Sequence, residues 1–313
     1  MSPLALPRRR ALAVLAGAAL SLSLAACSGG PAPAPTTAGG SPTGKALVIG
    51  SSGSTEGKVL AEVYAGALNA SGVKASTGPD FGAREAYVKA LEDGSVDVVP
   101  EYTGGLLLFL DPEAGQASAG DVAEALADRI PEGLAVLDRS KAEKKDVLVV
   151  TRLTAEKYSL TSIEDLAKVC SELVFGAPAA FAERDDGLPG LKAEYGCEPK
   201  RLARFTDHGG PVTLKALLTD QVQVADIYTT APSIEDNDLV VLEDPKDNFI
   251  AQQVVPLVRT ETVPEAARAV LNQVSSKLTT QDLMDLNRAV SGNQKQSPAA
   301  AAKAWLAEKG FAS

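Results

Sequence analysis

The chain has 313 residues, of which 45% are hydrophobic and only 4% aromatic, and it carries a formal net charge of −10 with a single histidine. This hydrophobic fraction is enough for a folded core, whereas the acidic balance excludes a protein that binds nucleic acid or an anionic membrane surface through its charge. Beyond an N-terminal leader, about 270 residues remain, which suits one large or two medium domains.

The first 26 residues have the three parts of an export signal: Arg8-Arg9-Arg10, an apolar run over 11–24, and small residues before Cys27. The apolar run is shorter than the about 20 residues that a membrane-spanning helix needs. Its ending, Leu24-Ala25-Ala26-Cys27, resembles the bacterial lipobox, which implies a lipid on Cys27 that holds the mature protein at the outer face of the cell membrane. An ordinary signal with an incidental cysteine is the alternative. The general secretory and twin-arginine export routes both stay open.

Residues 27–44 are rich in proline, glycine and serine and have too little apolar content to fold. Such a mixed composition predicts a tether between the lipid and a folded body. The body then begins with a buried strand at Lys45–Gly50, a hydroxyl-rich turn at 51–56 and a helix. A strand, a small-residue loop and a helix N-terminus together form a place for a polar or anionic ligand group. The loop lacks the phosphate-binding glycine-lysine pattern, so we do not expect a nucleotide.

Two similar segments each end in a Tyr-Thr pair. Lys89-Ala90-Leu91 precedes a short strand and Tyr102-Thr103, and Lys215-Ala216-Leu217 precedes another strand and Tyr228-Thr229 at the same offset. Each pair follows a strand, at the carboxyl edge where open parallel sheets bind ligands. This repetition predicts two similar lobes that face each other across a cleft. The alternative is a chance repetition of common residues, with both tyrosines in the core.

Between and after these units the pattern alternates strands with helices. Asp146–Val150 is apolar enough to be buried on both faces and is a candidate to cross between lobes, and 254–258 can return the chain to the first lobe. Thr161 or Ser162 caps a helix, and the chain from 263 onward is helical. The predicted boundaries are 45–149 with 252–313 for the first lobe and 150–251 for the second.

Cys170 and Cys197 remain after Cys27 is assigned to the lipid. An even pair of cysteines in an exported protein predicts a disulfide. Two free, buried thiols are the alternative.

The body resembles the substrate-binding proteins of ABC importers for osmoprotectants such as glycine betaine, choline, carnitine and proline. The matching segments span most of the body: Gly50–Glu56, Ala90–Gly94, Pro100–Gly104, Leu188–Lys192 with Tyr195-Gly196, Asp226–Thr230, Leu239–Asp244 and Leu283–Asn287. The resemblance implies an α/β, type II periplasmic-binding-protein fold, with two α/β lobes joined by two crossing strands around a ligand cleft. It also implies capture of a small solute for a permease and its ATPase.

The resemblance further implies a ligand site. Members of the family hold a quaternary ammonium among tyrosines through cation–π attraction, which assigns Tyr102 and Tyr228 to the ligand. Arg184 matches the place of an arginine that grips a ligand carboxylate with paired hydrogen bonds, although a surface ion pair with Glu183 or Asp185 is the alternative. The predicted ligand-binding residues are Ser52, Tyr102, Thr103, Gly105, Asp146, Arg184, Tyr228, Thr229 and Gln252.

This sequence also departs from the family. Leu148 and Gln252 stand where relatives often carry a tyrosine, and Ser52 stands where a lysine is common. Loss of two rings weakens a trimethylammonium cage by about 0.5–2 kcal/mol per ring. We therefore expect a ligand other than glycine betaine.

Two other functions compete with import. An enzyme needs a nucleophile with a base or clustered metal ligands, but His208 is interpreted as a loop residue, and no catalytic, metal or cofactor site is predicted. A sensory or scaffold lipoprotein that binds a small molecule without transport is the second competitor. A monomer is expected in either case.

Overall fold

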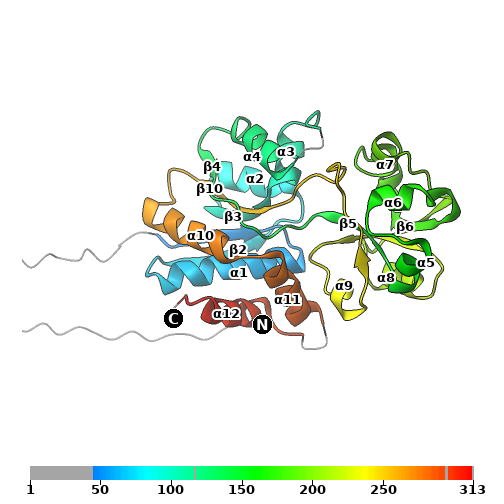
Figure 1. The fold of residues 1–313 in the computed structure, drawn as a ribbon. Coiled ribbons are helices and arrows are strands. Elements are labelled where there is room, and N and C mark those ends of the chain that lie inside the picture. The colour runs from blue at the N-terminus through cyan, green and yellow to red at the C-terminus, as the bar shows by residue number, and fades with distance from the viewer. Residues whose placement is uncertain (1–44, 116–117, 293–294, 312–313) are drawn as a thin grey trace, which may run out of the picture. The chain divides into compact units, whose positions relative to one another are not determined.

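The computed structural model describes residues 45–115, 118–292 and 295–311, so the predicted export signal, tether and Cys27 lie outside the described residues. Two mixed, five-stranded sheets organise the described chain. Each sheet has helices on both faces, and together they form two α/β lobes (Figure 1). Within this part of the chain, no helix is long and apolar enough to span a bilayer.

The first lobe is built on a sheet with the order β2-β1-β3-β10-β4. β1 runs parallel to β2 and β3, whereas β10 is antiparallel to β3 and β4. Its strands are β1 (Leu47–Ser51), β2 (Ala75–Asp80), β3 (Val98–Tyr102), β4 (Leu134–Val136) and β10 (Val254–Arg259). Its helices are α1 (Thr55–Ala70), α2 (Arg84–Glu92), α3 (Thr103–Leu110), α4 (Ala119–Ala127), α10 (Glu265–Lys277), α11 (Thr280–Ser291) and α12 (Pro298–Glu308).

The second lobe repeats this topology, with the order β7-β6-β8-β5-β9. β6 is parallel to β7 and β8, and β5 is antiparallel to β8 and β9. Its strands are β5 (Asp146–Val150), β6 (Val174–Pro178), β7 (Arg201–Phe205), β8 (Val224–Tyr228) and β9 (Val240–Val241). Its helices are α5 (Arg152–Tyr158), α6 (Ile163–Ala167), α7 (Leu188–Tyr195), α8 (Pro211–Leu218) and α9 (Ser233–Asp236), with 3-10 turns at Cys170–Glu172 and Ala179–Ala182.

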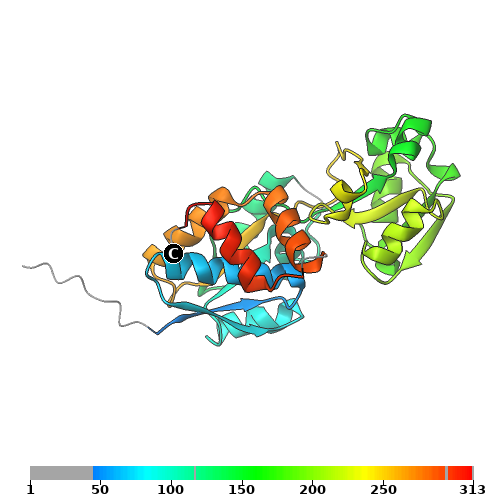
Figure 2. The ribbon, with the colours of Figure 1, turned by 90° about the horizontal axis from the view of Figure 1, so that it is seen from below.

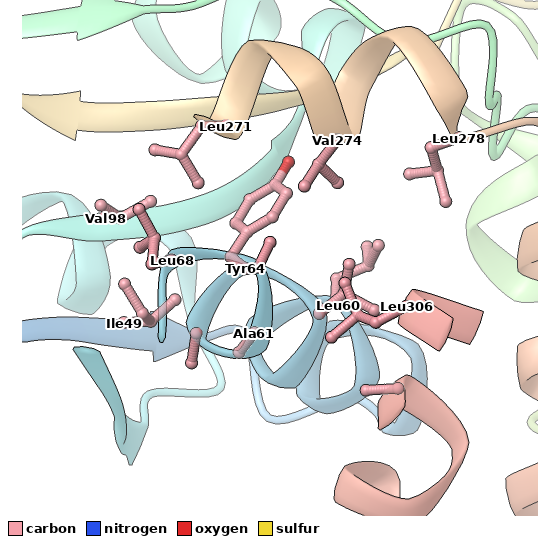
Figure 3. Close-up of a cluster of buried hydrophobic side chains, with 14 of the residues drawn as sticks. Ile49, Leu60, Ala61, Tyr64, Leu68, Val98, Leu271, Val274, Leu278 and Leu306 are labelled. Carbon is pink, nitrogen blue, oxygen red and sulfur yellow. The ribbon is translucent and has the colours of Figure 1, made fainter. Parts of the chain in front are cut away.

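Apolar side chains on both faces of each sheet make the cores. In the first lobe, α1, α10, α11 and α12 pack on one face and α2, α3 and α4 on the other (Figures 1 and 2). The fully buried Tyr64 of α1 projects its ring toward Val274 of α10, between Leu68 and Leu60 of its own helix (Figure 3). Because buried apolar surface is the main driving force of folding, these contacts stabilise the sheet that ends at Tyr102.

The separation of the two strand–tyrosine units into different sheets is confirmed, because β3 belongs to the first sheet and β8 to the second. The first crossing between the lobes lies earlier than the predicted boundary at Val149. β5 begins at Asp146 and pairs with β8 over its whole length, so it is a strand of the second lobe. The two segments that cross between the lobes pair with each other at the antiparallel bridge between Glu143 and Gln253.

A disulfide joins Cys170 to Cys197 in the second lobe, and both residues are buried in its core. Ser162, one of the two predicted caps, begins α6 by accepting a hydrogen bond from the Asp165 amide at 3.2 Å.

The predicted C-terminal helix is divided into α10, α11 and α12. α10 ends at Lys277 and α11 begins at Thr280, where Thr279 and Asp282 form a reciprocal capping box. β2 was missed because Ala75–Asp80 is a largely exposed edge strand with no alternation of apolar residues.

Candidate functional site

Strand register places the two tyrosines at the ends of their strands, as predicted. Tyr102 is the last residue of β3 and faces Val254 of the returning strand β10. Tyr228 is the last residue of β8 and faces Asp146, the first residue of β5. Each tyrosine therefore lies where a crossing segment enters or leaves its sheet, and both are partly exposed.

Residues from both lobes line one cavity of about 580 Å³. The first lobe contributes Leu108 and the segment after α3, the second lobe contributes Arg184, Asp186 and Tyr228, and Phe249, Ile250 and Gln252 come from the returning chain. A second cavity of about 300 Å³ is lined by Ser52, Glu101 and Tyr102 and shares Lys144, Tyr228 and Gln252 with the first. The shared residues make one cleft of a size typical of small-molecule sites.

Glu101 anchors the first-lobe wall of the cleft. Its carboxylate is only 1% exposed and accepts 2.6 Å hydrogen bonds from Arg84 Nε and from the Tyr102 amide, together with one from the Tyr87 hydroxyl. A side chain at Gly105 would approach Arg84 Nη2 to 2.7 Å and disturb this arrangement. Glu101 thus positions Tyr102 through its amide, and Gly105 leaves room for the Arg84 guanidinium.

The Tyr102 hydroxyl donates a hydrogen bond to Glu56, a buried residue in the first turn of α1. Asn287 Nδ2 of α11 donates to the other oxygen of Glu56 at 2.6 Å and to the Thr230 carbonyl of the second lobe at 3.1 Å. Burial, and then the charge of Glu56, raises the pKa of Tyr102 well above its usual value. Tyr102 therefore stays neutral, with its hydroxyl engaged and its ring beside the cleft.

Arg184 is paired on both sides. Its Nη2 donates to Asp146 at 2.8 Å and its Nε lies 2.8 Å from Asp186. The partners foreseen as the alternative, Glu183 and Asp185, are not the ones that the structure shows. Behind this cluster lies Asp226, 4% exposed, with one carboxylate oxygen that has no hydrogen-bond partner among the described residues.

Asp146 and Asp186 thus pair directly with the Arg184 guanidinium, and Asp226 interacts with this cluster through its charge. Burial, and then the charge of Asp146, raises the pKa of Asp226 well above its usual value, with Arg184 opposing the shift. Burial raises the pKa of Asp186 as well. Burial, followed by the charges of Asp146 and Asp226, raises the pKa of Tyr228 to about 12.

We expect Asp226→Asn to stabilise the protein at pH 7. An acid whose pKa is raised in the folded state holds its proton there while the unfolded chain has lost it, so stability falls as pH rises from about 4 through the raised pKa. The amide cannot ionise, and its free energy of unfolding should decline less over this range. Urea unfolding at pH 4 to 8 measures the difference.

The control for this prediction is Asp128→Asn, which removes the same charge at an exposed position. It should leave the shape of the wild-type profile unchanged. An Asp226→Asn variant whose stability follows the wild type in parallel across this range would contradict the assignment.

The other predicted site residues divide into two groups. Ser52 and Gln252 line the cleft, and Gln252 Oε1 also accepts the Gly105 amide at 2.8 Å. Thr103 and Thr229 line neither cavity of the cleft. The Thr103 hydroxyl accepts from the Gln253 amide at 3.0 Å, and the Thr229 hydroxyl accepts from the Lys145 amide at 3.0 Å. Both threonine hydroxyls therefore bind the backbone of the segments that cross between the lobes.

Leu148, interpreted as a missing cage ring, is 1% exposed and packs in the core of the second lobe. Leu148 lines neither described cavity of the cleft, whereas Asp146, two residues earlier at the start of β5, lines the larger one. Sequence reasoning also missed Lys144 and Asp186, which line the cleft, and Asp226, which is buried behind the Arg184 cluster. Asp226 had a signal, because it is the one charged residue in an otherwise apolar strand.

Two α/β lobes with one cleft lined from both define a solute-binding protein of the two-lobed periplasmic type. The family model for the substrate binding domain of ABC-type glycine betaine transport systems matches residues 45–308, and the chain belongs to this family. It is the extracytoplasmic solute-binding component of importers of the osmoprotectant class.

Individual relatives cover most of the chain. The glycine betaine-binding protein YehZ of Escherichia coli K12 is 28% identical over 276 residues, which is 84% of this chain and 90% of the relative. The carnitine transport binding protein OpuCC of Listeria monocytogenes is 26% identical, over 84% of this chain and 86% of its own length. The crystal structure of a glycine betaine/carnitine/choline ABC transporter superposes with a TM-score of 0.76 over 85% of this chain and 99% of the other at 23% identity, which shows the shared fold.

Proposed function

We propose that the protein captures one small polar solute in the cleft between Tyr102, Arg184 and Tyr228 and passes it to the permease and ATPase of an ABC importer. A lipid on Cys27 holds the protein to the outer face of the cell membrane, and it works as a monomer without a catalytic step. The observation that carries this proposal is the cavity of about 580 Å³ to which both lobes contribute side chains.

Closure of the lobes follows from this arrangement. Each lobe supplies only part of the cavity lining, so a solute that contacts both favours the conformation in which they are close. The two crossing segments pair through the Glu143–Gln253 bridge, and the Lys144 amide donates to the Gln252 carbonyl at 3.0 Å. A hinge at 142–145 and 251–253 can absorb the motion.

The arginine–carboxylate cluster limits the choice of solute. Two named relatives bind glycine betaine and carnitine, both of which are trimethylammonium carboxylates. Here Asp146 and Asp186 already pair with Nη2 and Nε of Arg184, so a ligand carboxylate at this guanidinium has to compete with two carboxylates of the protein. This supports a solute other than glycine betaine.

A calorimetric screen of the mature body with betaines, choline, carnitine, proline, polyols and aromatic solutes should identify at least one solute that binds with 1:1 stoichiometry. Tyr228→Ala should weaken the binding of that solute about tenfold or more, because Tyr228 lines both cavities of the cleft. Tyr158→Ala in α5 is the control and should bind as the wild type does. A Tyr228→Ala variant with unchanged affinity would contradict the assigned cleft.

A further inference from the structure

The cleft contains a cation of its own. The Lys144 ammonium lies 4.7 Å from the centre of the Tyr228 ring and 5.5 Å from that of Tyr102. Both distances are within the about 6 Å over which a cation is attracted to an aromatic face. The same ammonium is 3.7 Å from Glu56 Oε1, and the lysine side chain is only 24% exposed. One residue of the crossing segment therefore bridges the tyrosines of both lobes.

The surroundings of this ammonium form a built cation position. Glu56 is 6% exposed and is held by the Tyr102 hydroxyl and by Asn287, so its carboxylate has a fixed place. Two ring faces and one buried carboxylate are the groups that recognise an organic cation, and aromatic cages of this kind bind quaternary ammonium ligands. The position is suited to such a ligand and is already filled.

A tethered occupant competes strongly with a free ligand. Because Lys144 belongs to the same chain, its effective local concentration is of the order of millimolar. A quaternary ammonium that needs this position binds only the fraction of molecules in which the lysine has left. Its apparent affinity is the intrinsic affinity multiplied by that fraction. A solute without a permanent positive charge can bind elsewhere in the cleft and leave Lys144 in place.

We propose that Lys144 is an internal competitor for the cation position between Tyr102 and Tyr228, and that the cleft thereby selects solutes without a permanent positive charge. This inference deepens the proposed function and rests on it. Lys144 lines both cavities of the cleft, so it acts on the site directly. The ammonium also offers donors to a hydrogen-bonding or anionic group of the solute.

The test replaces Lys144 by methionine, which keeps the length of the side chain and removes its charge. Lys144→Met should bind tetramethylammonium and glycine betaine at least about tenfold more tightly than the wild type in calorimetry, because the competitor is gone. The matched control is Lys145→Met. The neighbouring lysine is paired with Asp244 and Asp247 at 3.8 Å and has no tyrosine partner in the described structure. The affinity of the Lys145→Met variant for both probes should equal that of the wild type.

An equal or weaker affinity in Lys144→Met, or no binding at all, would overturn the inference. Wild-type binding of both probes as tight as that of the variant would also overturn it. The proposed function has a separate outcome in this experiment, because it fails if no solute of the wider panel binds the wild type. A panel solute that binds the wild type, together with no gain in Lys144→Met, rejects the inference alone.

A second measurement needs no variant. In the wild type, the ε-methylene protons of Lys144 should show an upfield ring-current shift in proton NMR, and tetramethylammonium at high concentration should move them toward ordinary lysine values. Lys144 protons at ordinary values in the ligand-free protein would contradict the inference even if Lys144→Met does not fold.

Discussion

Replacing Arg84 by methionine should lower the free energy of unfolding by about 3 kcal/mol. Arg84 is the charged partner of Glu101, whose carboxylate is 1% exposed. Without the guanidinium, the Tyr87 hydroxyl and the Tyr102 amide are the remaining donors to this buried negative charge within the described part of the chain. An unpaired buried charge is costly because water that would solvate it is excluded. Urea unfolding followed by circular dichroism measures the loss.

The matched control is Arg129→Met. Arg129 pairs with Asp111 at 3.1 Å but is 48% exposed, so its loss should cost less than about 1 kcal/mol. Equal effects of the two substitutions would show that Glu101 does not depend on Arg84. Because Glu101 also binds the Tyr102 amide, Arg84→Met should weaken solute binding as well, whereas Arg129→Met should not.

Removal of the disulfide should have a comparable effect. The double variant Cys170→Ala/Cys197→Ala loses a cross-link between residues separated by 27 positions, which in the chain-entropy model costs roughly 3–4 kcal/mol of unfolding free energy. Both cysteines belong to the core of the second lobe, so that lobe should lose the most protection in hydrogen exchange.

A reductant supplies the control for the disulfide. Equilibrium unfolding of the wild type with a phosphine reductant should approach the stability of the double variant, and the variant itself should not respond. Identical wild-type curves with and without the reductant, under conditions in which free thiols are detected after unfolding, would contradict a stabilising role.

The strand-end tyrosines were predictable because they rest on strong local signals. Tyr102 and Tyr228 each follow a short run of buried residues, and the repetition of the whole unit indicated two sheets. Asp146–Val150 was likewise recognised with its correct bounds, because an unbroken apolar run is typical of a buried strand. Its lobe was not predictable, since pairing with β8 is decided by contacts far away in the sequence.

The interior of the cleft was less predictable. Arg184 was singled out, but its partners Asp146 and Asp186 lie on different elements, and only the fold brings them together. Lys144 precedes a strand beside a second lysine, and nothing in the pair tells which of them faces the tyrosines. Asp146 and Leu148 lie on the same face of β5, and their positions along the strand separate them: Asp146 at its first position lines the cleft, whereas Leu148 is buried in the core of the second lobe.

A single solute should bind between the two lobes, and a crystal structure of the protein with the solute found by calorimetry will show where it lies. We expect one molecule in the cavity of about 580 Å³, in contact with Tyr228 of the second lobe and with first-lobe residues such as Leu108. A solute bound outside this cavity, or in contact with one lobe only in every copy, would show that the two lobes do not share a binding site.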